Sequence, residues 1–218
     1  MGAYTLQLRF SSQDLKTIAQ AGESVVVAKA FSDSATNVAW VVFTPFENNF
    51  VSWDEAYAFF ASPAQSSGTV QILSASQGTA LSGRYYTFDG TGFEGPYPGE
   101  TAPPAGSFRV INQVPSQQYP ALGFGLLQSA TVNGEGFPSL ATNQEIVPAA
   151  QYATFTPLET VYVWLQSGVR TGAIVTLPPA APRPAQAVAG FATEIQFAGP
   201  STLTYSYDAS TGTFFPSH

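Results

Sequence analysis

The sequence predicts an all-β protein, an antiparallel β-sandwich built from two pseudo-symmetric halves with one short N-terminal helix. Three observations lead to this prediction: the composition, the alternation of apolar residues and an internal repeat. Phe and Tyr number 17 and 10, whereas Met occurs once, and aromatic residues favour strands. With 44% hydrophobic and only 10% charged residues in 218, the chain can bury a large core. We therefore expect one domain over residues 1–218.

Apolar residues recur with the period of half-buried strands. YTLQLRF (4–10) is apolar at every second position, which is typical of a strand with one buried face. ESVVVAKAF (23–31) and NVAWVVFTPF (37–46) are β-branched and aromatic runs bounded by turn residues. NFVSWDEAYAFFAS (49–62) alternates in the same way, with Glu55 as an interruption of its apolar face.

One helix is expected at SSQDLKTIAQAG (11–22). Ser11 and Asp14 have the spacing of a capping box, and Gly22 suits the end of a helix. Two proline-rich stretches, 96–106 and 177–187, are expected to be loops or extended crossings and not strands.

The sequence repeats itself at an interval of about half its length. Three collinear pairs of segments match: FTPFENNFV (43–51) with FTPLETVYV (155–163), SGTVQI (67–72) with TGAIVT (171–176), and YYTFDGTGF (85–93) with YSYDASTGTF (205–214). A period this long exceeds that of solenoid repeats. It predicts two half-domains, about 3–106 and 107–218, related by an approximate two-fold axis.

Charge and composition exclude several classes of partner. The net charge is −7, with only seven Lys and Arg residues, so nucleic acid and anionic membrane surfaces are unfavourable partners. No apolar run is long enough to cross a membrane as a helix, and MGAYTLQLRF (1–10) lacks the pattern of a secretory signal. A soluble intracellular protein is the expectation, and the scarcity of surface charge is compatible with a homodimer.

The catalytic inventory is small. The chain has no cysteine, and its one histidine is the terminal His218, so cysteine nucleophiles, histidine-assisted serine triads and zinc sites of the usual type are not expected. Glu47 and Glu159 occupy matching places in the repeat, and paired carboxylates can hydrolyse glycosides. A Glu at such a position more often accepts a hydrogen bond in a turn or faces water than takes part in catalysis. We expect no catalytic residue and no enzyme.

Metal binding has no clear signature either. Asp54 with Glu55, and Asp89 with Asp208, supply carboxylates. However, hard cations need several converging oxygen ligands, and no regular Asp-x-Asp-x-Asp spacing is present. Asp89 and Asp208 fall at matching turns, where Asp commonly bonds to the backbone. We therefore assign no metal ligand, and the sequence leaves open whether a metal ion is bound.

Aromatic side chains are the remaining candidates for a binding site. Tyr and Trp present a flat apolar face and one polar tip, which suits stacking on a sugar or enclosing an apolar ligand. Any single one is more often a core residue. The five candidates are Trp53, Trp164, Tyr86, Tyr205 and Trp40. Trp53 and Trp164 are the better two, because the repeat places them one residue out of register and therefore on opposite faces.

The chain resembles small β-sandwich proteins of mushroom fruiting bodies, among them pigment-binding chromoproteins. This resemblance rests on the repeated FTPFE…FV and FTPLE…YV segments, the net negative charge and the absence of a secretory signal pattern. The resemblance covers the whole chain loosely and has no diagnostic motif. It implies a non-catalytic sandwich that holds a small terpenoid-like chromophore without a covalent bond. No pocket residue carries over from it.

Four hypotheses of function follow from these observations. The first is a binding protein for a small apolar or conjugated ligand, such as a pigment. The second is a carbohydrate-binding lectin, with exposed aromatic residues beside polar loop residues such as Asn48, Asn49 and Asn133. A membrane-active defence protein is third, because it needs a basic patch and the chain has only seven Lys and Arg residues. A carboxylate-dependent hydrolase using Glu47 and Glu159 is last.

Overall fold

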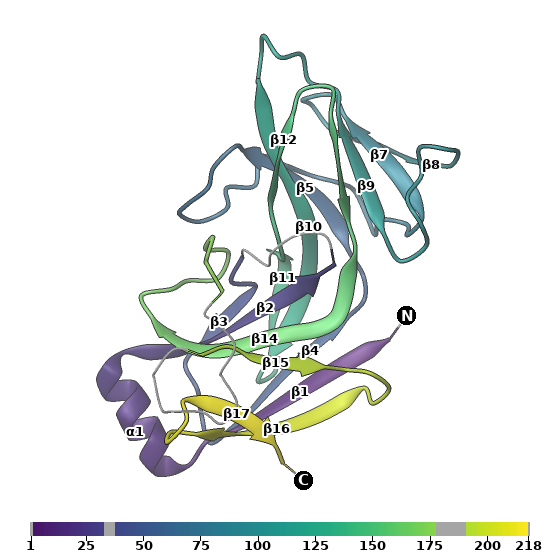
Figure 1. Ribbon diagram of the computed structural model, residues 1–218. Coiled ribbons are helices and arrows are strands. Elements are labelled where there is room, and N and C mark those ends of the chain that lie inside the picture. The colour runs from purple at the N-terminus through teal and green to yellow at the C-terminus, as the bar shows by residue number, and fades with distance from the viewer. Residues whose placement is uncertain (1, 33–37, 178–190, 218) are drawn as a thin grey trace.

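A computed structural model describes residues 2–32, 38–177 and 191–217. The described residues form one helix and seventeen strands, which assemble into three sheets (Figure 1). The predicted all-β class is therefore confirmed. The N-terminal strand and the C-terminal hairpin lie at the same end of the molecule.

The single helix begins and ends where the sequence predicts. Helix α1 (Ser12–Ala21) is preceded by Ser11, whose side chain accepts a hydrogen bond from the backbone of Asp14, while Asp14 reaches back to the backbone of Ser11. Gly22 ends the helix in the left-handed conformation, with φ of 64°, which glycine adopts without steric cost. Ile18 is the buried residue of the helix.

The largest sheet has nine strands. Seven follow the order β17-β16-β1-β4-β10-β5-β6, and β11 and β12 also pair with β10. Their bounds are β1 (Ala3–Arg9), β4 (Asn48–Asp54), β5 (Ala58–Pro63), β6 (Ser74–Ala75), β10 (Ala121–Val132), β11 (Glu135–Ala141), β12 (Glu145–Pro148), β16 (Thr202–Asp208) and β17 (Thr213–Pro216).

Two four-stranded sheets complete the structure. One has the order β15-β14-β2-β3, with β2 (Glu23–Phe31), β3 (Val41–Phe43), β14 (Pro157–Ser167) and β15 (Thr193–Gln196). The other has the order β13-β9-β7-β8, with β7 (Arg84–Phe88), β8 (Phe93–Tyr97), β9 (Phe108–Asn112) and β13 (Tyr152–Phe155).

The sequence predicts antiparallel sheets, but two of the sheets also contain a parallel pair of strands. Strand β1 pairs with β16 in parallel, and so does β7 with β9. Parallel neighbours need a long connection. The chain supplies one in each case, because almost the whole sequence separates β1 from β16, and β8 with the turns that follow it separates β7 from β9.

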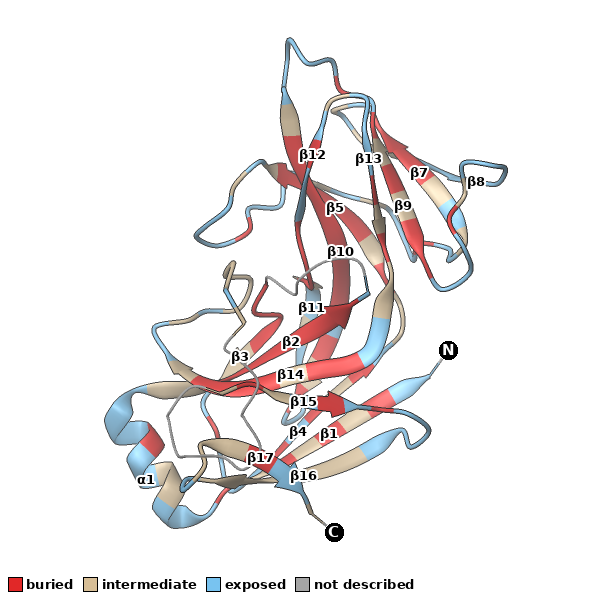
Figure 2. Cartoon of the chain, viewed as in Figure 1, coloured by how far each residue is buried: buried red, intermediate tan, exposed pale blue. Residues whose placement is uncertain are grey.

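Both small sheets pack on the large sheet and give two buried clusters (Figure 2). The first cluster joins inward residues of β1, β2, β4, β14 and β15, such as Leu6, Val27 and Val163. The second cluster joins β5, β10 and the sheet of β7, β9 and β13, with residues such as Phe59 and Phe124. Strand β10 is long enough to contribute to both clusters. The arrangement is that of a sandwich with an extended large layer.

The structure does not confirm two pseudo-symmetric halves. FTPFE (43–47) links β3 to β4, whereas FTPLE (155–159) runs from β13 directly into β14. The matched strands lie in different sheets, since β3 does not share a sheet with β13, nor β4 with β14. The large sheet also mixes the two predicted halves, since β1 lies between β4 and β16. Local similarity fixes how a strand ends, but the partners of that strand depend on distant residues.

The third match in the repeat does share local features. YYTFDGTGF and YSYDASTGTF each form a hairpin, β7–β8 and β16–β17. Asp89 and Asp208 occupy the two turns and accept hydrogen bonds from the backbones of Thr91 and Ser210. Hydrogen bonds from Thr91, that of its backbone first, lower the pKa of Asp89 to about 2. The hydroxyl of Ser210, and then its backbone, lower the pKa of Asp208. The expected turn role of both residues is confirmed.

The proline-rich stretches differ from their prediction in one respect. Pro96 and Tyr97, expected in a loop, belong to β8 at the edge of its sheet. An edge strand tolerates proline because the missing N–H need not enter a ladder. Most of the stretch 177–187 lies outside the described residues.

Candidate functional site

A wide bulge interrupts the large sheet where β4 passes into β5. Both strands pair with β10, through Ser52 opposite Thr131 and Ala58 opposite Leu127. Five residues, 53–57, therefore face three residues of β10, 128–130. A bulge redirects side chains that regular alternation would place elsewhere. Here it accommodates Glu55, the residue that interrupts the predicted strand.

Lys29 lies opposite this bulge on β2. Val25, Val27, Lys29 and Phe31 share the inward face of the strand, and Lys29 is 0% exposed. Val27 belongs to the first buried cluster and Phe31 to the second. The lysine therefore lies at the junction of the two clusters. A charged group in such a place needs a partner, because burying an isolated charge is costly.

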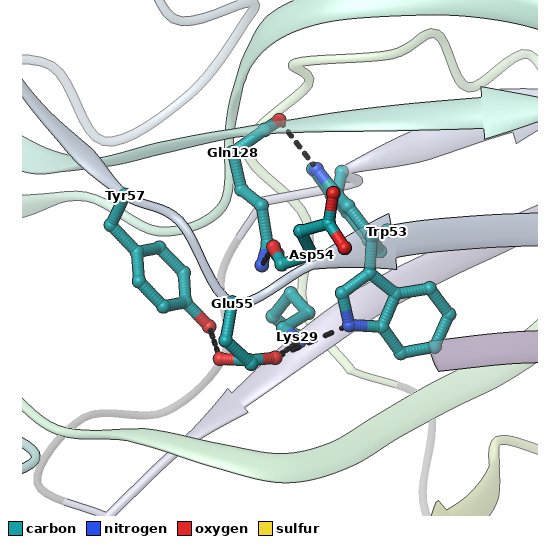
Figure 3. A network of polar contacts seen from close by, with 7 residues as sticks. Lys29, Trp53, Asp54, Glu55, Tyr57 and Gln128 are labelled. Carbon is teal, nitrogen blue, oxygen red and sulfur yellow. Dashed lines mark hydrogen bonds and ion pairs between the residues drawn. The ribbon is translucent and has the colours of Figure 1, made fainter. Parts of the chain in front are cut away.

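Glu55 is that partner (Figure 3). Its Oε1 lies 3.1 Å from the Nζ of Lys29, and the side chains are 0% and 22% exposed for Lys29 and Glu55 respectively. Oε1 also accepts a hydrogen bond from the Nε1 of Trp53 at 3.2 Å, and Oε2 accepts one from the hydroxyl of Tyr57 at 2.5 Å. The rings of Trp40 and Trp53 lie 5.5 Å and 4.9 Å from the ammonium, which is within range of cation–π attraction.

Burial shifts the pKa values of Lys29 and Tyr57 in this polar cluster in opposite directions. Burial lowers the pKa of Lys29, and the carboxylate of Glu55 partly offsets this effect. Burial also raises the pKa of Tyr57, and Glu55 raises it further because a phenolate would be repelled. Gln128 holds the bulge in place, since its Nε2 donates to the backbone oxygen of Asp54 at 2.7 Å.

A second bulge lies on the other side of Lys29. Pro157 of β14 pairs with Phe31, but Val161 pairs with Lys29, so three residues of β14 bulge opposite one of β2. Glu159 lies in this segment and is exposed. It contacts Tyr4: burial first, and then the hydrogen bond to Glu159, raise the pKa of the Tyr4 hydroxyl to about 12. The carboxylates of the two bulges thus contact side chains of β2 and β1, Lys29 and Tyr4.

The outer face of the large sheet carries a cleft beside the first bulge. Its volume is about 440 Å³. Strands β1, β4 and β10 and the bulge form its walls, and the polar residues that line it are Thr5, Ser52, Asp54, Ser129 and Thr131. Trp53 and Tyr4 also contribute to the lining, although both are largely buried. The cleft thus combines hydroxyl groups and one carboxylate with the apolar surface of alanine and aromatic residues.

Strand register explains why hydroxyl groups gather there. Thr131 pairs with Ser52, Ser52 with Thr5, and Thr5 with Thr202. Directly paired residues point to the same face of a sheet, so these four residues form a row across β10, β4, β1 and β16. Neighbouring strands are about 4.8 Å apart, so the row extends over about 14 Å. We call these four residues the hydroxyl row.

The structure brings together two of the five predicted aromatic residues. Trp40 and Trp53 pack edge to face with their ring centres 5.5 Å apart, and Trp53 lines the cleft. Trp40 is fully buried, and its Nε1 donates to the backbone oxygen of Gln128. Trp40 is therefore a core residue.

The other three predicted aromatic residues lie elsewhere. Trp164 is 0% exposed in a separate cluster on the opposite face of β2 and β14, and its Nε1 donates to Gln166. Tyr86 is buried in the second cluster, where its hydroxyl accepts a hydrogen bond from the backbone of Leu81. Tyr205 packs half-buried at the margin of the first cluster. Trp40, Trp53 and Tyr205 are thus associated with the first cluster, whereas Tyr86 and Trp164 lie in two others, because sheet partners and not sequence spacing decide which strands meet.

The predicted carboxylate pair faces different neighbours. Glu47 accepts a hydrogen bond from the hydroxyl of Ser12 at the start of α1, whereas Glu159 contacts Tyr4. Within residues 2–32, 38–177 and 191–217, no group of three or more His, Cys, Asp or Glu residues could hold a metal ion.

Sequence reasoning missed Lys29 and the hydroxyl row. A signal existed for the lysine, because it occupies an inward position in the apolar strand ESVVVAKAF. The hydroxyl row has no local signal, since its members come from strands far apart in the sequence.

Among the residues that the structure describes, no helix is long and apolar enough to cross a membrane. The chain matches no family model, no curated protein and no solved structure.

Proposed function

We propose that this protein is a non-catalytic binding protein whose outer cleft takes a small, uncharged, hydroxylated ligand, with carbohydrate as the ligand class. The hydroxyl row is the observation that carries this proposal. Each hydroxyl both donates and accepts hydrogen bonds, as the hydroxyl groups of a sugar do. Three of its members, Thr131, Ser52 and Thr5, line the cleft together with Asp54, whose carboxylate accepts hydrogen bonds only.

The aromatic residues favour this class over an apolar ligand. A pocket for an apolar molecule is lined mainly by hydrophobic side chains, whereas five of the ten residues that line this cleft are Thr, Ser or Asp. Of the five predicted aromatic residues only Trp53 is among them. Binding of a conjugated ligand, which the resemblance to fungal chromoproteins implies, stays a prediction. An absorbance spectrum and an intact mass of protein purified from its natural source would test it, because a bound pigment absorbs visible light.

Titration calorimetry with a panel of neutral monosaccharides and disaccharides tests the carbohydrate proposal. The double variant Thr5→Val/Thr131→Val keeps β-branched side chains in both strands and removes two hydroxyl groups. Each lost hydrogen bond costs about 1 kcal/mol, so we expect affinity to fall about tenfold or more. Thr17→Val, at an exposed position of α1, is the matched control and should bind as the parent does.

Two results would contradict the proposal. One is that no neutral sugar in the panel binds to the parent protein. The other is that the double variant binds a sugar as tightly as the parent while both proteins show the same thermal unfolding.

A further inference from the structure

The outer face of the large sheet continues beyond the cleft. In the strand register, Phe50 of β4 pairs with Gln7 of β1, and Gln7 pairs with Thr204 of β16. These residues form a second row beside the hydroxyl row, two positions further along each strand. The Oγ1 of Thr204 donates to the Oε1 of Gln7 at 3.2 Å. The second row therefore begins where the cleft ends and presents amide, hydroxyl and aromatic groups.

Two phenylalanine rings stand exposed on this face. Phe50 and Phe215 are each 47% exposed, so both rings are accessible to a ligand. Phe215 pairs with Ser206 of β16, and Ser206 pairs with Arg9 of β1. Both rings therefore lie on the face that carries the cleft.

The register also gives the separation of the rings. Three strand steps, from β4 through β1 and β16 to β17, amount to about 14 Å. The rings are also offset by two residues along the strands, or about 7 Å. Their Cα atoms are thus about 16 Å apart, which exceeds the length of one sugar ring. A ligand that contacts both rings and the cleft is a chain of several units.

The charge of the face indicates which kind of chain. Three charged residues point outward from β1, β4, β16 and β17: Arg9, Asp54 and Asp208. Their sum is −1, and the whole chain carries −7. A polyanion would be repelled at long range, whereas an uncharged polymer of hydroxylated rings matches both the polar rows and the exposed rings.

We propose that the cleft is one end of an extended face that binds a linear, uncharged polysaccharide, with Phe50 and Phe215 as stacking platforms for successive sugar units. This inference rests on the proposed function, since it extends the same ligand class along the sheet. The phenylalanine rings contribute apolar contact with the faces of the sugars. The hydroxyl row and Gln7 supply the hydrogen bonds.

The test compares two pairs of substitutions on probes of different length. Affinity electrophoresis and pull-down use β-1,3-glucan, β-1,4-glucan, chitin and α-mannan, and calorimetry uses the corresponding monosaccharides and disaccharides. Phe50→Ala/Phe215→Ala should weaken binding to at least one polymer by about tenfold or more, with binding of the short sugars unchanged. Tyr119→Ala removes a ring that is 44% exposed outside this face and serves as the control.

The results distinguish failure of the extended binding face from failure of the proposed function. If the phenylalanine variant retains full polymer binding while Thr5→Val/Thr131→Val loses it, the extended face is wrong and the cleft remains. If neither polymers nor short sugars bind to the parent, both proposals fall. Preferential binding of a sulfated or carboxylated polymer, weakened by added salt, would also overturn the assignment to an uncharged ligand.

Discussion

Replacing Glu55 by glutamine removes the carboxylate that faces Lys29 and keeps the size of the side chain. The Nζ and Oε1 atoms are 3.1 Å apart, and two unit charges at that distance attract each other by about 5 kcal/mol at an effective dielectric constant of about 20. Breaking a buried pair on one side typically costs about 3 to 5 kcal/mol, because the remaining charge loses its opposite charge. We therefore expect Glu55→Gln to lower the free energy of unfolding by about 3 to 5 kcal/mol at pH 7.

The loss should shrink as the pH rises. Burial lowers the pKa of Lys29, and Glu55 opposes that shift, so the variant should have an even lower lysine pKa in the folded state. Between that pKa and the unfolded value of about 10.4, the unfolded chain binds more protons, and stability therefore increases with pH. The difference between parent and variant should therefore become smaller as the pH rises toward the lysine pKa of the unfolded chain.

Urea unfolding followed by tryptophan fluorescence measures these differences. The rings of Trp40 and Trp53 lie beside the Lys29 ammonium, so the signal reports on the altered region. Lys29→Met removes the buried charge and leaves Glu55 partly hydrated, and it should cost less than Glu55→Gln. Glu47→Gln, at an exposed carboxylate, should leave the midpoint unchanged. Equal stability of parent and Glu55→Gln at pH 7 would refute the reasoning.

Two further predictions concern packing and alkaline pH. A Cβ at Gly125 would lie 2.2 Å from the backbone oxygen of Asn143, so Gly125→Ala should destabilise the fold by about 2 kcal/mol or more, as measured by urea unfolding. Gly136→Ala, where a Cβ meets no atom within 4 Å, is the control, and similar midpoints for the two variants would contradict this account. The pKa of Tyr4 is raised to about 12, so the folded protein keeps a proton that the unfolded chain loses, and stability should fall as pH rises from about 10. Tyr4→Phe should show a shallower alkaline decline, and an unchanged slope would count against the assigned pKa shift.

Local features of the fold were predictable because their causes lie within a few residues. The helix follows from the capping box of Ser11 and Asp14 and from the left-handed residue Gly22. The two hairpins follow from turns in which Asp89 and Asp208 bind the backbone. The alternation of apolar residues in 4–10 gives the buried face of β1. Each of these features can be predicted without knowing which strands are its neighbours.

The candidate site was only partly predictable. Trp53 was expected at a binding site and lines the cleft, whereas Trp164 was expected to be an equal candidate and is sealed in another cluster. Glu55 was recognised as an interruption of a strand, but its partner Lys29 was not. A bulge turns side chains in new directions relative to the paired strand. The position of Glu55 could therefore be predicted only if the neighbouring strand were known.

The sequence by itself determined that this chain is rich in strands, where its helix lies and which segments are half-buried. The tertiary structure alone decided which strands are neighbours. That decision sets Lys29 against Glu55 and lines up Thr131, Ser52 and Thr5 across the cleft. Backbone propensity and apolar periodicity act over a few residues, but strand pairing joins segments that are far apart in the chain, and the repeat of FTPFE and FTPLE did not reveal it.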